Sequence, residues 1–254
     1  MSKRPWVIAH IPHSSTLIPE KVLGQFLLAE TDLQRELLRM TDRFTDELFA
    51  LPAAMATMIV FPVSRLVVDP ERFEDDSKEE MVAKGMGVVY TKTSDRRALR
   101  RPITSAEREA LISKYYAPHQ RKLSAAVARA LSSSRTCLII DAHSFPSAPL
   151  PYEDDQTPER PAICIGTDAY HTPPDLERAT VEAFRREFDS VAVNRPFRGA
   201  LVPTDYYRKD KRVRSIMIEV NRSLYMDEET GQKTAGFGGV RARIRRALGE
   251  IIHG

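Results

Sequence analysis

The stretch TCLIIDAHSFP, residues 136–146, decides the fold of this chain. Its first half is a short apolar run rich in β-branched side chains, which predicts a strand buried inside a parallel or mixed sheet. Its second half brings Asp141, His143 and Ser144 before Pro146 ends the run. Open α/β sheets place their functional sites beyond the carboxyl ends of strands, so Asp141 and His143 become the first candidates for a metal or catalytic centre.

Segments of strand and helix character alternate along the rest of the chain. Apolar runs predict further strands at residues 6–10, 55–60, 66–68, 87–90, 162–166, 191–194 and 215–220. Helical spacing of apolar residues covers 31–49, 104–131 with an interruption at Pro118, 173–188 and 236–252. Thr31 with Gln34, and Thr104 with Glu107, match capping boxes. We predict one domain over residues 1–254, a three-layer α/β/α fold around a mostly parallel or mixed sheet.

The composition is that of an ordinary globular protein. Among 254 residues the net charge is +3, and no concentrated basic face suggests a nucleic-acid partner. No apolar run approaches the roughly 20 residues of a membrane helix, and the N-terminus lacks the apolar core of a signal peptide. Cys137 and Cys164 both lie in apolar runs, which indicates buried thiols in a reducing compartment. We expect a cytoplasmic protein that binds neither nucleic acid nor membranes, and the sequence leaves its oligomeric state open.

Three predicted strands end in groups that suit a metal centre. His13 follows the first strand, and His143 ends the central one. Two imidazoles and one carboxylate, with a fourth position open, make the usual catalytic zinc site. The carboxylate comes from Asp42 or Asp46, which are four residues apart and expected on one helical face. We predict one Zn²⁺ or other divalent ion bound by His13, Asp42 and His143, with Asp46, Asp141 and Ser144 supporting these ligands.

The last strand contains a carboxylate inside an apolar run, Glu219 in IMIEV. Burying a carboxylate is costly unless it pairs or reacts, and burial raises its pKa toward the range of a general base. An ion pair with Arg222 is the alternative explanation. We predict Glu219 as the catalytic base.

Several cationic and phenolic side chains lie near these groups in the sequence. Arginine forks bind carboxylates in a planar, bidentate manner, so a cluster of arginines around one metal suits an anionic substrate. Most arginines and tyrosines of a protein have no such role, and these remain candidates: Arg65, Arg195, Arg222 and Tyr206.

Five pieces of this sequence, in order, resemble the N-formylglutamate amidohydrolase family from about residue 10 to about residue 227. They are PHSS at 12–15, TDRFTD at 41–46, SRLVVDPER at 64–72, DAHS at 141–144 and IEVNRSLY at 218–225. No single piece is specific to this family, whereas the five together, in this order, are.

The resemblance implies a phosphorylase/hydrolase-like fold, distantly similar to aspartoacylase and zinc carboxypeptidases. It implies zinc-dependent hydrolysis of the formyl amide of N-formyl-L-glutamate, which releases formate and glutamate in histidine breakdown. It also implies His13 and His143 as ligands, Glu219 as the base, and Asp69 and Arg72 as an element that grips a substrate carboxylate. Glu71 replaces the asparagine usual in that element, which bears on the acyl-amino-acid specificity.

Two other functions stay open at this point. One is a carboxypeptidase- or aspartoacylase-like hydrolase of another N-acyl amino acid or short peptide, favoured by Glu71 and by the long loop at 146–161. The other is a non-catalytic binding protein on the same fold, in which the basic terminal helix docks an acidic partner.

Overall fold

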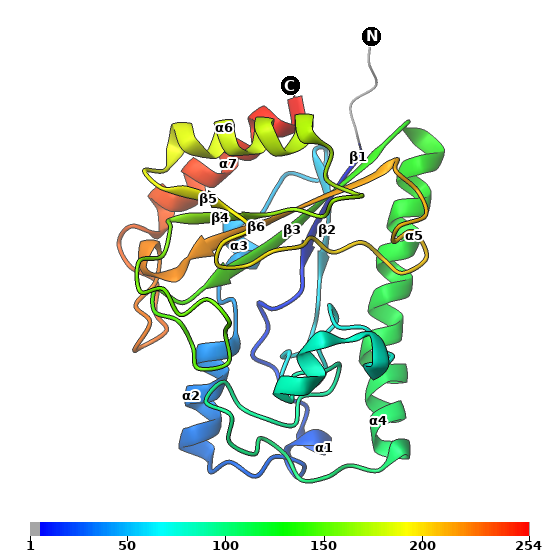
Figure 1. The fold of residues 1–254 in the computed structure, drawn as a ribbon, viewed down its shortest axis with the longest axis vertical. Helices are drawn as coiled ribbons and strands as arrows, with labels where there is room; N and C mark the ends of the chain where they lie inside the picture. The colour runs from blue at the N-terminus through cyan, green and yellow to red at the C-terminus, as the bar shows by residue number, and fades with distance from the viewer. Residues whose placement is uncertain (1–5, 254) are drawn as a thin grey trace.

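The computed structural model describes residues 6–253, and its centre is a six-stranded sheet (Figure 1). The strands are β1 (Trp6–Ile11), β2 (Ala56–Val60), β3 (Cys137–Phe145), β4 (Ile163–Gly166), β5 (Val191–Val193) and β6 (Val213–Asn221). Their order is β2-β1-β3-β6-β4-β5, and all neighbours are parallel except β4 and β6. The predicted mixed sheet is therefore confirmed, with residues 136–146 as one of its two central strands.

Helices cover both faces of this sheet (Figure 1). The α-helices are α1 (Glu20–Leu23), α2 (Glu30–Met40), α3 (Thr45–Leu48), α4 (Ser105–Leu111), α5 (Ala117–Ser133), α6 (Pro174–Glu187) and α7 (Phe237–His253). Short 3-10 turns lie at η1 (Asp76–Lys78), η2 (Glu80–Lys84) and η4 (Arg222–Leu224), and a π-helical turn at η3 (Ile112–Tyr116). Within residues 6–253, no helix is long and apolar enough to cross a bilayer.

Strand β3 is buried along its whole length because both of its faces pack against helices. Leu138 and Ile140 point to the side covered by α6 and α7, where they join the largest apolar cluster. Cys137 and Ile139 point to the other side and pack in the cluster that includes residues of α5. Cys137 and Cys164 are buried free thiols, as predicted. The three-layer α/β/α architecture is confirmed.

Two predicted strands are wrong. Residues 66–68 form a turn and residues 87–90 an irregular segment, although their apolar side chains are buried except for that of Val89, which is half-buried. They pack with α1, α2 and α4 and with each other into two small clusters. A short apolar run satisfies such a cluster as well as it satisfies a strand, so the pattern alone did not separate the two.

Helix boundaries also differ from the prediction in three places. Helix α2 begins at Glu30 with Ala29 as its N-cap, so the capping box at Thr31 is wrong, whereas the box of Thr104 and Glu107 is confirmed. Pro118 stands in the first turn of α5, and helical structure runs from Ser105 to Ser133 through the π turn. The chain leaves helix after Met40 and re-enters it at Thr45, so Asp42 and Asp46 do not share a helical face.

Candidate active site

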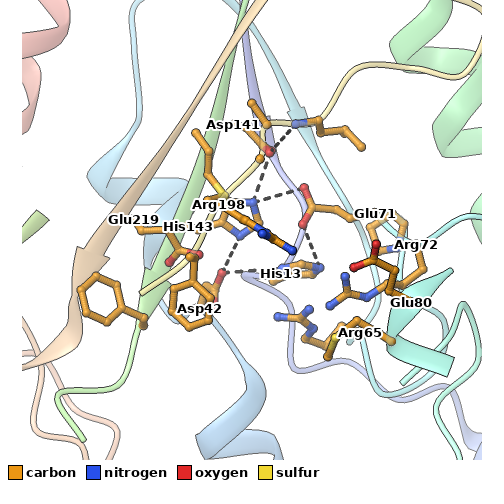
Figure 2. Close-up of a pocket in the computed structure, with 18 of the residues that line it drawn as sticks. His13, Asp42, Arg65, Glu71, Arg72, Glu80, Asp141, His143, Arg198 and Glu219 are labelled. Atoms are coloured by element: carbon orange, nitrogen blue, oxygen red, sulfur yellow. Dashed lines mark hydrogen bonds and ion pairs between the residues drawn. The ribbon is translucent and has the colours of Figure 1, made fainter. Parts of the chain in front are cut away.

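A pocket of about 1060 Å³ lies at the carboxyl ends of β1, β3 and β6 (Figure 2). His13 lies two residues beyond β1, while His143 and Glu219 lie within β3 and β6. The register pairs His143 with Glu219 on neighbouring strands, so both side chains leave the sheet at the same level and on the same face. All three side chains line the pocket.

His13, Asp42 and His143 converge in this pocket as a buried group with the geometry of a metal site. Oδ2 of Asp42 lies 3.1 Å from Nδ1 of His143 and 3.7 Å from Nδ1 of His13. The two imidazole centroids are 5.1 Å apart. Nδ1 of His13 is buried and has no hydrogen-bond partner among the described residues. A divalent cation would give this nitrogen the partner it lacks, so the donor set fits a metal.

Asp42 reaches this position from the loop between α2 and α3. Its backbone N–H donates to the carbonyl of His13 at 2.9 Å, which fixes the loop against the end of β1. Nη2 of Arg222 donates to Oδ1 of Asp42 at 2.9 Å, leaving Oδ2 to the histidines. Burial acts to raise the pKa of Asp42, but the nearby imidazoles of His13 and His143 and the charge of Arg222 outweigh it and hold the pKa far below its ordinary value. Asp42 is therefore ionised, as a metal ligand must be.

Each histidine of this group has a carboxylate at its other nitrogen. Nε2 of His13 is 3.0 Å from Asp69, and Nε2 of His143 is 3.2 Å from Glu71 and 3.3 Å from Asp141. Such outer carboxylates fix the ring orientation and leave the inner nitrogen free to bind a cation. The arrangement is the one expected of metal-binding histidines.

Glu219 lies beside this group with one carboxylate oxygen uncommitted. Its Oε2 is buried and has no hydrogen-bond partner among residues 6–253. Burial, together with the charges of Asp42 and Glu71, raises the pKa of Glu219 to about 8, against the opposing effect of His143 and Arg222. The alternative explanation, an ion pair of Glu219 with Arg222, is absent among the described residues, because Arg222 is engaged by Asp42 and Ser144. A free, weakly acidic carboxyl next to a metal site suits a proton acceptor.

Comparison with known proteins supports the interpretation of this pocket as a candidate active site. The family model described as N-formylglutamate amidohydrolase matches residues 5–226.

The chain belongs to the N-formylglutamate amidohydrolase family.

Two solved structures share the fold. One is an N-formylglutamate amidohydrolase from Ralstonia eutropha JMP134, with a TM-score of 0.82 and 24% identity, covering 99% of this chain and 93% of that one. The other is the gene product Atu2144 from Agrobacterium tumefaciens, with a TM-score of 0.63 and 20% identity, covering 97% of this chain and 92% of that one. No curated protein sequence matches the chain. Family membership thus makes the pocket the candidate active site of an amidohydrolase.

The arginines that the sequence suggested for substrate binding differ in their contacts. Arg65 forms a fork with Asp69, at 2.8 and 3.2 Å, and Arg222 binds Asp42, so both are committed to carboxylates of the metal-site framework. Asp69 is fully buried beside His13 and is not among the pocket-lining residues, which favours support of His13 over direct contact with a substrate. Arg72 lines the pocket with only long contacts, 3.7 Å to Asp69 and 3.9 Å to Glu79.

Besides Asp69, three predicted site residues do not line the pocket. Asp46 is exposed on α3, and Arg195 is an exposed partner of Asp155. Tyr206 packs against the apolar cluster near α5 instead of lining the pocket. Asp141 and Ser144, in contrast, line it and contact His143 and Arg222 respectively.

Two pocket residues were missed as functional candidates. Glu71 lies against His143, and its other oxygen is 3.7 Å from Nε2 of His13. Its position in the sequence element expected to bind a substrate carboxylate was the signal that could have identified it. In the sequence it stood out only as a replacement of asparagine. Tyr152 lines the pocket from the loop after β3, and no local sequence pattern marked it.

Proposed function

We propose that this protein is a zinc-dependent hydrolase of the amide bond in N-formyl-L-glutamate or a similar N-acyl amino acid. The observation that carries the proposal is the convergence of His13, Asp42 and His143 beside the unpartnered carboxyl oxygen of Glu219. Amide hydrolysis needs an activated water, a proton acceptor and a site for the substrate charge. The pocket offers groups for each of these needs.

His13, Asp42 and His143 would hold one divalent cation per chain. When bound, such an ion acts as a Lewis acid that polarises a carbonyl group and lowers the pKa of water toward about 7. Two imidazoles and one carboxylate are the ligands of many catalytic zinc sites, which favours zinc among the divalent metals.

Glu219 would move the proton. Its free Oε2 accepts a proton from the attacking water, and the resulting acid donates it to the nitrogen of the leaving amine. Because burial raises its pKa, the carboxyl group binds that proton strongly enough to carry it between the two steps. Amide nitrogen is a poor leaving group unless it is protonated, so this transfer is what allows the C–N bond to break.

Arg72 is one guanidinium available to a substrate carboxylate. It lines the pocket, and its Nε has no hydrogen-bond partner among the described residues. Arg65 and Arg222 form ion pairs with Asp69 and Asp42 and add positive charge to the pocket. An anionic acyl amino acid is therefore the substrate class that the charges of the pocket favour.

The test is hydrolysis by zinc-loaded protein of formyl-, acetyl- and peptidyl-glutamate, measured side by side. We expect the formyl compound to be the best substrate, and Glu219→Gln to retain zinc while losing at least about 100-fold in kcat. Turnover near the wild-type level in Glu219→Gln would show that another group is the base.

A related hydrolase of another acyl amino acid or short peptide is the second candidate. Glu71 favours it, because a negative charge at His143 changes the surroundings of a bound substrate. A clear preference for the acetyl or peptidyl compound in the same assay would establish it. The release of formate and glutamate, the role in histidine breakdown and the cytoplasmic location stay predictions.

A further inference from the structure

The loop between β3 and β4, residues 146–161, is a fixed wall of the pocket. Arg160 forms a buried ion pair with Glu153, and its guanidinium lies 5.7 Å from the ring centroid of Phe145 and 5.8 Å from that of Phe197. Nε2 of Gln156 donates to the carbonyl of Leu150 at 3.0 Å. These contacts tie the loop to itself and to the end of β3, so the residues between them have a defined position.

Tyr152 lies on this wall with its hydroxyl uncommitted. Its side chain packs at the edge of the apolar cluster that contains Leu66 and Tyr90, and it lines the pocket. Tyr152 is half-buried, and among residues 6–253 its hydroxyl has no hydrogen-bond partner, whereas each of the three buried tyrosines has one. Tyr90 donates to Asp69 at 2.5 Å, Tyr116 to the carbonyl of Arg72 at 3.0 Å and Tyr225 to the carbonyl of Arg43 at 3.0 Å.

The charged groups near this hydroxyl are three arginines and one carboxylate, that of Glu153. Burial raises the pKa of Tyr152 to about 12, against the opposing charges of Arg65, Arg72 and Arg222, so the phenol stays protonated and can only donate to an anion. Arg65 and Arg222 are already occupied by Asp69 and Asp42. Arg72 is not, because its Nε lacks a hydrogen bond and its nearest carboxylates are 3.7 and 3.9 Å away.

We propose that Tyr152 is a substrate-binding residue whose hydroxyl donates a hydrogen bond to the substrate carboxylate that pairs with Arg72. A phenol O–H and a guanidinium that both line the pocket can together bind a carboxylate, and they would discriminate against the corresponding uncharged amide. The loop fixes the phenol before the ligand arrives, so little conformational entropy is lost on binding. This inference rests on the proposed function and adds a specificity residue to it.

Tyr152→Phe tests the inference, with Tyr115→Phe as the matched control. Tyr115 is a half-buried tyrosine that does not line the pocket. For zinc-loaded Tyr152→Phe we expect KM for N-formylglutamate to rise about tenfold, with kcat within about twofold, because a hydrogen bond to a charged group is lost. The preference for N-formylglutamate over its two mono-amides should fall by a similar factor. An unchanged KM and an unchanged preference would overturn the inference.

Calorimetric binding of L-glutamate separates this inference from the proposed function, because it needs no turnover. Tyr152→Phe should weaken glutamate binding about tenfold and Tyr115→Phe should not, with zinc content and Tm equal in all three proteins. Equal affinity in the three proteins, or no binding by the wild type, would refute the role of Tyr152. A wild type that binds glutamate but hydrolyses no formyl compound would refute the function alone.

Discussion

At the scale of single residues, the buried carboxylates in and beside the pocket differ in the groups that contact them. Asp42 and Asp69 are buried, have pKa values far below the ordinary range and contact histidines and arginines. Glu219 is equally buried but has a raised pKa, because its Oε2 has no donor among the described residues. Donors to a carboxylate stabilise its charge, and their absence leaves burial as the dominant effect. The first pair is therefore stabilised as carboxylates, and Glu219 is the one that we propose as the proton acceptor.

The choice between Asp42 and Asp46 as metal ligand gives a prediction at this scale. Asp42→Asn should lower zinc affinity by at least about 100-fold, since loss of even an outer partner costs about 10–100-fold. Asp46→Asn should leave the affinity within about twofold, because that side chain is exposed on α3. Competition with a chromogenic chelator measures both. Thermal unfolding in EDTA shows whether Asp42→Asn remains folded, and equal zinc affinity in the two variants would exclude Asp42 as a ligand.

At the scale of elements, strand register is what assembles the site. β3 pairs with β1 and β6 so that Asp141 lies beside His10 and His143 lies beside Glu219. A slip of one residue would turn each of these side chains to the opposite face of the sheet. The two faces of β3 pack into two different apolar clusters. A slip would send each side chain into the wrong cluster, so the packing of these clusters opposes it.

The two capping boxes read from the sequence give a prediction at the scale of helices. Thr104→Ala should destabilise the protein by about 1 kcal/mol, because the Thr104 hydroxyl accepts from the N–H of Glu107 at the start of α4. Thr31→Ala should change stability by less than about 0.5 kcal/mol, because Thr31 is exposed inside α2 and caps nothing. Urea denaturation of both variants measures the difference. A larger loss in Thr31→Ala than in Thr104→Ala would contradict the helix boundaries described.

At the scale of the whole molecule, the sheet and its two helical layers enclose a group of charges that a cation would balance. Asp42, Asp69, Asp141 and Glu219 are all buried around the histidines. The stability of the metal-free protein should therefore depend on pH through these groups. The organisation of residues 1–254 as a single domain stays a prediction at this scale.

Glu219 fixes the direction of one part of that pH dependence. Burial raises its pKa from 4.5 to about 8 in the folded protein. The folded pKa lies above the unfolded one, so its contribution to stability is complete below pH 4.5 and is lost as the pH rises toward 8, by at most about 1.4 kcal/mol per pH unit. The amide of Glu219→Gln does not ionise, so this variant does not lose that stability as the pH rises.

Chemical denaturation of EDTA-treated proteins at pH 5, 6, 7 and 8 tests this dependence. The free energy of unfolding of Glu219→Gln, relative to wild type, should increase across the series. Glu109→Gln, which changes an exposed acid on α4, should show a flat difference. A flat difference for Glu219→Gln as well would mean that this carboxyl is ionised without cost in the fold.

The sequence by itself determined the elements and the chemistry that they could carry. Runs of apolar residues located all six strands, and polar residues at their ends made His13, His143 and Glu219 candidates, because these signals are local. The tertiary structure alone decided which distant groups meet. Asp42 and His143 are 101 residues apart and hydrogen-bonded, whereas Asp46, Arg195 and Tyr206 lie elsewhere. Contact between such residues depends on strand order and loop paths, which no local pattern of side chains contains.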